Sequence, residues 1–344
     1  VLFDSVHGHM CAGRNKYTTN PNIHELRKAI SDKVAALYGT RFDVESEVTV
    51  TAGATQAIFT AVAAFVRPGD EVIVFEPVYD SYVPAIETVG GKAVFAQLQF
   101  PDYTPDWAQV RALITPKTRM VIINSPHNPT GSLLSAVDLD KLAELLRGTD
   151  IIVLSDEVYE HILFDGERHA SVAGHPELAA RSIVVSSFGK TYHITGWKIG
   201  YVLASTALMA EFRKVHQFNV FTVHTPSQLG LAEYMQDASR HLGLAKFYEE
   251  KRDFFRGLLA ATPFELLPCR GTYFQLARYS AISDLPDRAF AEWMTRQMGV
   301  AVIPVSVFYA DGRDDKVVRF CFAKKEETLL AAAERLGKLS ETKK

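Results

Sequence analysis

The sequence is poor in cysteine, lacks a long apolar run and carries no strong excess of either charge. Its 344 residues include three cysteines, Cys11, Cys269 and Cys321, which lie far apart and lack the spacing of metal ligands. Isolated thiols of this kind are typical of a reducing compartment, so we expect a cytoplasmic protein. No grouping of His, Cys and Asp has metal-ligand spacing either, and we expect no metal ion.

The net charge of −3 argues against a protein dedicated to nucleic acid or to an anionic membrane. The longest apolar run, Ala57–Val66, is too short to span a bilayer. Asp4, His7 and His9 stand where a signal peptide would need an apolar segment. With 47% hydrophobic and 22% charged residues, the composition is that of a soluble globular enzyme with about two domains.

Short apolar, β-branched runs alternate with helical patterns over most of the chain. Several of these runs show no polar alternation, as expected of strands that are covered on both faces. The order of strands and helices predicts an α/β fold with a mostly parallel, seven-stranded sheet covered by helices and right-handed crossovers. The predicted strands are 47–51, 71–75, 93–96, 120–124, 151–154, 182–186 and 199–204, and the clearest helices are 23–38, 56–66 and 135–147.

The pattern changes after Pro263, where short strands and helices mix in a way that predicts a smaller α+β domain. Residues 206–259 before it are mainly helical. We therefore expect a large domain at 14–255 and a small domain formed by 1–13 and 256–344. The predicted strands of the last third are 271–276, 302–304 and 317–322, and its helices are 288–298 and 325–338.

Polar residues follow the predicted strands at their carboxyl ends, where open α/β sheets bind ligands. One rim of the sheet would carry a turn at a helix start, an aromatic ring, an amide, a buried acid, a phenol and a lysine. This set suits a phosphorylated aromatic cofactor that bears an aldehyde. In chain order the residues are Gly53, Ala54, Thr55, Tyr79, Asn128, Asp156, Tyr159, Ser187 and Lys190.

Lys190 comes directly after a buried, β-branched strand. A lysine in this place can lose its proton and act as an amine nucleophile, although most lysines are solvated. The other residues also have simpler explanations. Asp156 could cap a helix, Tyr79 could pack in the core, and Arg319, inside an apolar strand, could form a structural salt bridge. Residues 128–131 could form a plain turn.

Three motifs favour the catalytic interpretation of these residues. They are Asn-Pro-Thr-Gly at 128–131, Asp-Glu-Val-Tyr at 156–159, and Ser-x-x-Lys with Gly-x-Lys-x-Gly-Tyr at 187–201. In this order they are jointly very specific. From Tyr17 to the C-terminal helix, the chain resembles the fold-type I, class I/II aminotransferases that use pyridoxal 5′-phosphate (PLP). Within that family it looks most like the methionine aminotransferases and the kynurenine/glutamine aminotransferases.

The resemblance implies a role for each residue of the site. Lys190 forms a Schiff base with PLP and carries the proton between the substrate Cα and the cofactor. Asp156 keeps the pyridine nitrogen protonated, and Tyr159 and Asn128 bind the 3′-oxygen. Arg319, together with Asn128, binds the substrate α-carboxylate. The remaining contacts are Tyr79 against the ring, and Gly53, Ala54, Thr55, Ser187 and Lys198 at the phosphate, where the wider class usually has arginine in place of Lys198.

Tyr17 matches the family tyrosine that reaches the phosphate of the neighbouring subunit. The resemblance thus implies a homodimer with shared active sites. The family often has glycine five residues later, where this chain has Asn22. Because the sequence starts at Val1 rather than at methionine, we also expect that a native N-terminal arm, which helps to close the substrate pocket in relatives, is missing.

The expected activity is the transfer of an amino group from an amino acid to a 2-oxo acid in a ping-pong cycle. Aromatic and apolar residues at 79–82 and 305–309 favour an apolar or aromatic substrate over a dicarboxylate. Methionine is the first expectation, followed by aromatic amino acids, glutamine and kynurenine with 2-oxoglutarate. Two alternatives are a PLP-dependent β-lyase for cystathionine or cysteine S-conjugates, and a PLP-binding regulator domain without catalysis.

Overall fold

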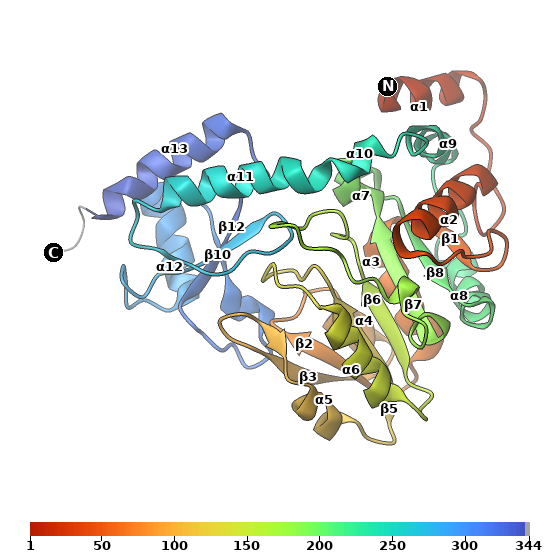
Figure 1. Cartoon of the computed structure of the whole chain (residues 1–344), viewed down its shortest axis with the longest axis horizontal. Helices are drawn as coiled ribbons and strands as arrows, with labels where there is room; N and C mark the ends of the chain where they lie inside the picture. The colour runs from red at the N-terminus through yellow and green to blue at the C-terminus, as the bar shows by residue number, and fades with distance from the viewer. Residues whose placement is uncertain (341–344) are drawn as a thin grey trace.

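The computed structural model describes residues 1–340, which divide into a large half built on one extensive sheet and a smaller half at the opposite end (Figure 1). Neighbouring strands of the large sheet follow the order β1-β8-β7-β6-β5-β2-β3-β4. The strands are β1 (Val48–Thr51), β2 (Glu71–Glu76), β3 (Lys92–Gln99), β4 (Thr104–Pro105), β5 (Thr118–Asn124), β6 (Ile152–Asp156), β7 (Ser182–Ser187) and β8 (Gly200–Ala204).

The central strands β7, β6, β5, β2 and β3 are parallel, whereas β8, β1 and β4 join as antiparallel neighbours. The prediction of a mostly parallel α/β sheet is confirmed. The sheet has eight strands rather than seven, because the chain turns back after β3 and pairs Thr104 and Pro105 with it. A strand of two residues is too short to show any periodicity in the sequence.

Alternate residues of the central strands enter two separate cores, one on each face of the sheet. In β6, for example, Val153 belongs to one core, and Ile152 and Leu154 belong to the other. This explains the continuous apolar runs of the strand sequences. The helices of the large half are α1 (Leu2–Cys11), α2 (His24–Tyr38), α3 (Gly53–Phe65), α4 (Tyr82–Thr88), α5 (Trp107–Leu113), α6 (Ala136–Leu146), α7 (Phe188–Thr191), α8 (Thr206–Asn219), α9 (Thr225–Tyr234) and α10 (Ser239–Leu242).

Helix ends follow the local chemistry of the sequence. Helix α2 stops at Gly39, which takes the left-handed conformation (φ 76°) that glycine adopts without strain. Helix α6 starts at a capping box in which Ser135 and Asp138 bond to each other's backbone N–H. Both ends agree with the predictions from the sequence.

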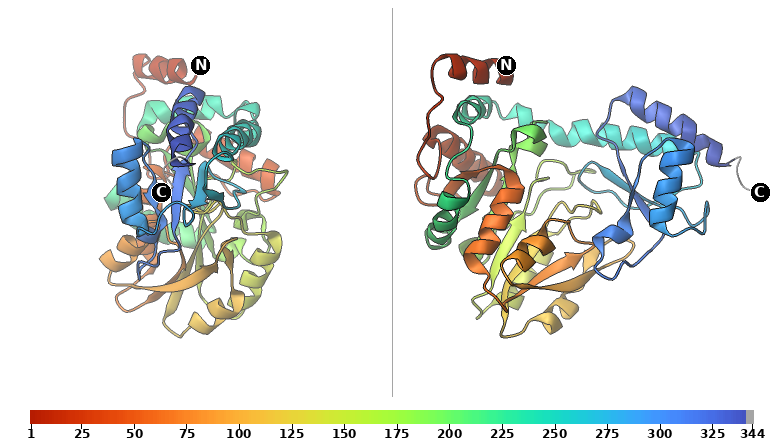
Figure 2. Two further views of the ribbon diagram at one scale, coloured as in Figure 1. Left: turned by 90° about the vertical axis from the view of Figure 1, so that its left-hand side faces the viewer. Right: turned by 180° about the vertical axis from the view of Figure 1, so that it is seen from behind.

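The small half carries a second sheet of order β11-β12-β10-β9, covered by helices (Figure 2). The long helix α11 runs from the large half to the small one along the top of the molecule in Figure 1. The elements are α11 (Leu244–Leu259), β9 (Glu265–Leu266), β10 (Phe274–Arg278), α12 (Asp287–Trp293), β11 (Ile303–Pro304), β12 (Val317–Cys321) and α13 (Glu326–Gly337). The predicted α+β character of this region is therefore present.

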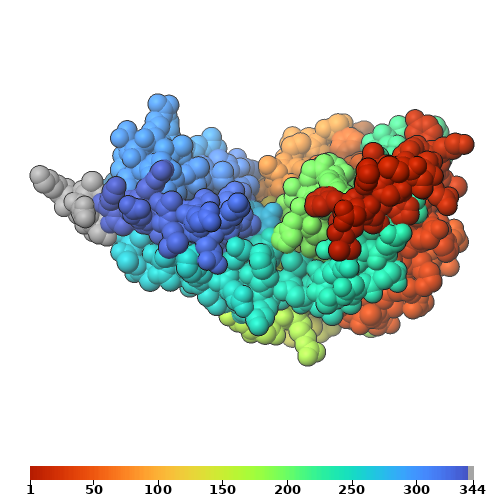
Figure 3. Space-filling view, turned by 90° about the horizontal axis from the view of Figure 1, so that it is seen from above, coloured from red at the N-terminus to blue at the C-terminus, as the bar shows by residue number. Residues whose placement is uncertain are grey.

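The first residues form a helix that packs on the large half. Ser5 and His9 both bond to Glu233 of α9, and Gly230 of α9 lets the buried side chain of Val6 approach closely. Figure 3 shows this segment in red, on the large half and away from the small half in blue. We expected residues 1–13 to join the small domain, but α1 lies against α9 instead. The division at 14–255 otherwise stays a prediction.

Across residues 1–340, the helices are all too short or too polar to meet the requirements of a membrane span.

Candidate active site

A cavity of about 210 Å³ opens at the carboxyl ends of β5, β6 and β7, beside the first turn of α3. Ten of the twelve site residues expected from the sequence line it. They are Gly53, Ala54, Thr55, Tyr79, Asn128, Asp156, Tyr159, Ser187, Lys190 and Lys198. The parallel strands explain this convergence, because their carboxyl ends meet at one edge of the sheet.

Asp156 is the last residue of β6, and only 3% of it is exposed. Its Oδ2 atom accepts a hydrogen bond from the Tyr82 hydroxyl at 2.6 Å, and Oδ1 accepts one from the Val158 N–H at 3.2 Å. Burial raises the pKa of this carboxyl group to about 6, although the two donors oppose the rise. A carboxylate held in this environment is best compensated by a cationic group placed beside it.

Lys190 lies in α7, the single turn that follows β7. Ser187 caps this turn by accepting the Gly189 N–H on its hydroxyl at 3.2 Å. The Nζ atom of Lys190 donates to the hydroxyl of Tyr273 at 2.8 Å and lies 5.6 Å from the centre of the Tyr159 ring. The end of one strand thus delivers an amine into the cavity that also holds Asp156.

Tyr159 follows β6 by three residues and is buried against the small half. Its ring meets those of Tyr273 and Phe274 edge-to-face, with centroids 5.3 and 6.2 Å away. Burial raises the pKa of its phenol. The hydroxyl therefore stays protonated at neutral pH and can donate a hydrogen bond.

The start of α3 at Gly53 lies beside the cation of Lys198, and Gly200 allows this close packing. Gly53 begins α3 with φ of 77°, and the first N–H groups of a helix lack partners within it. A Cβ atom at Gly53 would lie 3.5 Å from Cε of Lys198. One at Gly200 would lie 2.6 Å from the Ser186 carbonyl oxygen and 3.1 Å from the Gly53 carbonyl carbon. Only glycine allows this approach, which builds a site suited to a phosphate group.

Arg319 reaches the same region from β12 of the small sheet. Its Nη1 atom donates to Oδ1 of Asn128 at 2.6 Å, and its guanidinium lies 4.0 Å from the Phe274 ring and 5.1 Å from the Phe308 ring. Burial lowers the pKa of this arginine. Within the described residues its hydrogen-bond partner is the Asn128 amide and it forms no ion pair with a carboxylate, so the salt-bridge explanation loses support.

Tyr17 does not line this cavity in its own chain. It is 85% exposed, packs edge-to-face on Phe221 at 6.0 Å, and lines a separate surface cavity with residues 222–226. Its expected role across a subunit interface stays a prediction.

Three residues of the site were not predicted from the sequence. Asn124 bridges two strand ends, because it donates to the Asp156 carbonyl at 2.9 Å and accepts the Asn128 N–H at 2.8 Å. Its position at the end of a predicted strand was a usable signal. Tyr82 and Tyr273 had no local signal, since their contacts come from helix α4 and from a loop of the small half.

Comparison with known proteins settles the family. The model for aminotransferase class I and II matches residues 5–336. The chain belongs to this family. Like its other members, this aminotransferase moves an amino group between an amino acid and a 2-oxo acid.

Relatives and solved structures agree with this assignment. Methionine aminotransferase of Escherichia coli is 50% identical over 332 residues, covering 96% of this chain and 86% of that protein. Kynurenine–oxoglutarate transaminase 1 of Rattus norvegicus is 34% identical, covering 95% and 85%. A crystal structure of an E. coli protein with methionine aminotransferase function superposes with a TM-score of 0.96 at 49% identity, covering 98% of this aminotransferase and 89% of that chain. The family and the fold expected from the three motifs are confirmed.

Proposed function

We propose that this aminotransferase uses PLP and binds it in the cavity beside Lys190. The observation that carries the proposal is the convergence of Lys190, Asp156 and Tyr159 in one cavity. The buried Asp156 carboxyl, with its raised pKa, calls for a cationic partner, which the protonated ring nitrogen of PLP would provide. The start of α3 and Lys198 suit its phosphate. The residues present therefore fit the cofactor.

PLP, when bound, would supply an aldehyde carbon that takes up amines and a ring that withdraws electrons from the substrate. Lys190 would provide the amine that holds the cofactor and, once displaced, would move the proton at the substrate Cα. Tyr159 and Asn128 would hydrogen-bond the ring oxygen, and Tyr79 would cover the ring. Asp156 would hold a proton on the ring nitrogen.

Methionine is the amino donor that we propose first. The relative that is 50% identical is named methionine aminotransferase, and four of the five residues at 305–309 are apolar or aromatic. Phe308 lies against the guanidinium of Arg319, the proposed ligand of the substrate carboxylate. An apolar side chain would therefore be bound next to the carboxylate site. Kynurenine, glutamine and the aromatic amino acids are the other donors to compare.

The decisive experiment is a panel of amino acids against several 2-oxo acids, run with Lys190→Ala and with Lys246→Ala, an exposed lysine of α11, as a control. We expect the control to retain activity and Lys190→Ala to lose it. Near-normal transamination by Lys190→Ala would overturn the assignment. If cystathionine gave pyruvate much faster than methionine gave its 2-oxo acid, β-elimination would be the main activity.

We further propose a cytoplasmic homodimer in which Tyr17 serves the site of the partner subunit. The exposure of Tyr17 and of Phe3 and Phe218, together with three unpaired cysteines, supports this proposal. Mixing an inactive Lys190→Ala chain with an inactive Tyr17→Ala chain should then restore about a quarter of normal activity, because mixed dimers contain one intact site. No recovery in confirmed mixed dimers would contradict the shared site.

A further inference from the structure

The hydroxyl of Tyr273 is the polar partner of Lys190. The Nζ atom donates to it at 2.8 Å and lies 5.4 Å from the centre of the Tyr273 ring. Tyr273 belongs to the small half, whereas Lys190 follows a strand of the large sheet. The amine of the site is therefore held from across the junction of the two halves.

The loop that carries Tyr273 is fixed to the large half through its backbone. The N–H groups of residues 270 and 271 donate to the Gly131 carbonyl at 3.1 and 2.9 Å, and that of residue 272 donates to the Ile162 carbonyl at 3.0 Å. A Cβ atom at Gly271 would lie 2.9 Å from the same Ile162 oxygen and 2.8 Å from Cβ of Pro126. The backbone is thus packed with no space for a larger residue.

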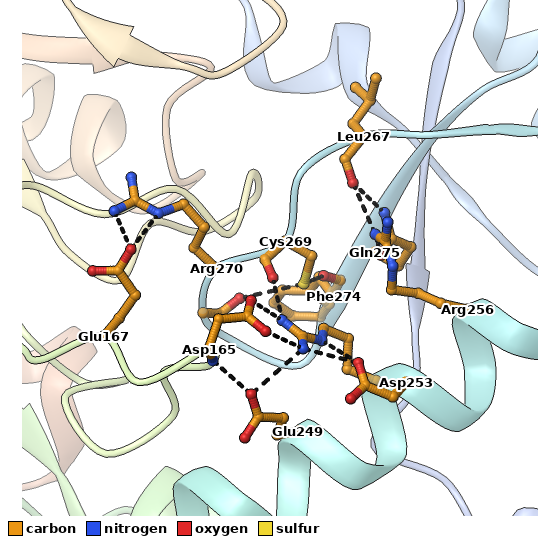
Figure 4. Close-up of polar contacts among 12 residues, drawn as sticks. Asp165, Glu167, Glu249, Asp253, Arg256, Leu267, Cys269, Arg270, Phe274 and Gln275 are labelled. Atoms are coloured by element: carbon orange, nitrogen blue, oxygen red, sulfur yellow. Dashed lines mark hydrogen bonds and ion pairs between the residues drawn. The ribbon is translucent and has the colours of Figure 1, made fainter.

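Side chains fix both ends of the same loop, as Figure 4 shows. Arg270 bonds to Glu167 at 3.0 Å through its Nε atom. Arg256 bonds to the side-chain oxygen of Gln275 at 2.8 Å and to the Leu267 carbonyl at 3.1 Å. Tyr273 therefore projects from a rigid segment, and its hydroxyl has a defined position toward Lys190.

The segment that holds Tyr273 also sets the position of Arg319. Strand β10 begins at the next residue, and its Leu276 stands opposite Arg319 of β12. One rigid piece of chain thus places both the partner of the amine and the arginine proposed for the substrate carboxylate. Precise placement of reacting groups is a large part of catalysis.

We infer that Tyr273 is a further catalytic residue, whose phenol oxygen accepts a hydrogen bond from Lys190 and orients its amine in the cavity. This inference rests on the role proposed above for Lys190. A lysine side chain has four rotatable bonds, and a fixed acceptor restricts the orientations of its amine. The ring of phenylalanine would keep the packing against Tyr159 but would lack the acceptor.

The test is Tyr273→Phe, with Tyr248→Phe as the matched control. The Tyr248 ring lies 5.8 Å from that of Tyr273, but its hydroxyl contacts His193 rather than Lys190. Two readouts need no turnover: the rate at which the cofactor-free protein bonds added PLP, followed by absorbance, and the dissociation constant of pyridoxamine 5′-phosphate, which forms no bond to lysine. The third readout is steady-state turnover of methionine, in which the change in kcat is compared with the change in KM.

We expect Tyr273→Phe to slow both PLP capture and kcat by about tenfold or more, since misplacing a reacting group by 1 Å can cost about 100-fold. KM and the affinity for pyridoxamine 5′-phosphate should stay within twofold of wild type, and Tyr248→Phe should match wild type throughout. Normal capture and kcat in Tyr273→Phe would overturn the inference while leaving the role of Lys190 intact. An equal loss of pyridoxamine 5′-phosphate affinity would overturn it too, because it would show a role in cavity shape.

Discussion

The ammonium group of Lys33 lies 2.7 Å from Oε1 of Glu160, and both side chains are almost completely buried. Glu160 follows Tyr159 of the site, and its carboxylate also accepts hydrogen bonds from Tyr38, Ser186 and Tyr201 at 2.6–3.0 Å. Ser186 and Tyr201 in turn adjoin the site residues Ser187 and Gly200. Successive strand residues point to opposite faces, so this charged cluster supports the strand ends from the side away from the cavity.

Replacement of Glu160 by Gln should destabilise the protein by about 3–5 kcal/mol, because Lys33 would remain buried without its counter-charge. Lys33→Met together with Glu160→Gln should cost less than the two single changes combined. Chemical unfolding of the four proteins measures this double-mutant cycle. Additive losses would show that the two side chains do not act as a pair.

The same cluster predicts how the stability of the protein depends on pH. Lys33 and the other donors hold the pKa of the Glu160 carboxyl well below its usual value despite burial. A carboxyl group with a lowered pKa contributes stability above its unfolded pKa and loses that contribution as the pH falls through the folded value. The stability gap between wild type and Glu160→Gln should therefore narrow in strong acid and be constant near neutrality. A gap that widens on acidification would contradict this account.

In the protein without cofactor, Asp156 should give stability the opposite dependence on pH. Its folded pKa of about 6 exceeds the unfolded value of 3.8, so its ionisation costs the folded state stability as the pH rises between these values. Asp156→Asn removes that cost and should stabilise the cofactor-free protein by up to about 3 kcal/mol at pH 8 but not at pH 4. Denaturant unfolding at the two pH values measures the effect.

The gain in stability should come with a loss of function. An amide cannot provide the negative charge proposed to pair with the ring nitrogen of PLP, so cofactor affinity and kcat should both fall for Asp156→Asn. Unchanged kinetics would remove Asp156 from the site. An equal stability gain at pH 4 and pH 8 would show that packing of Asp156, rather than its charge, lowers the stability of the wild-type protein.

Gly200→Ala should damage the proposed phosphate site. The added methyl group would stand 2.6 Å from the Ser186 carbonyl oxygen of β7 and 3.1 Å from the Gly53 carbonyl carbon, so it would force β8 away from β7 and from the start of α3. We expect a loss of about 2 kcal/mol or more in stability and weaker PLP binding. The control is Gly196→Ala. Gly196 lies five residues after Thr191 in the same motif, and a methyl group added there would face open space. Equal effects of the two changes, in melting temperature and PLP affinity, would refute the steric argument.

The sequence allowed the rim of the cavity to be predicted because its residues directly follow strands. Asp156 ends β6, and Asn128 and Lys190 lie four and three residues beyond the ends of β5 and β7, so the edge that the parallel strands share brings them together. Tyr82 and Tyr273 could not be predicted in this way. Tyr82 meets Asp156 because α4 folds back over the end of β6, and Tyr273 meets Lys190 because the small half docks beside β7. Neither packing arrangement produces a periodic pattern in the sequence.

The packing of residues 1–13 on α9 could not be predicted from the sequence for a related reason. Helix α1 has two buried apolar residues, Leu2 and Val6, and its position depends on the matching surface of α9. The bonds of Ser5 and His9 to Glu233 hold this helix against α9. Contacts between distant segments of this kind require the three-dimensional structure.

Arg319 offers a final test of the substrate side. Asn128 holds one guanidinium nitrogen at 2.6 Å, and the Phe274 and Phe308 rings flank the group, which leaves its other N–H donors for a carboxylate. Every α-amino acid carries that carboxylate, so Arg319→Ala should raise KM about 100-fold for all donors alike, as expected when one partner of a buried charged pair is removed. Arg319→Lys keeps the charge but loses the fork, and it should recover part of the affinity. Steady-state kinetics with methionine, phenylalanine and glutamine measure both variants. A loss confined to one donor would place Arg319 at the side-chain pocket instead, because only a contact with the variable part of the substrate can discriminate among donors.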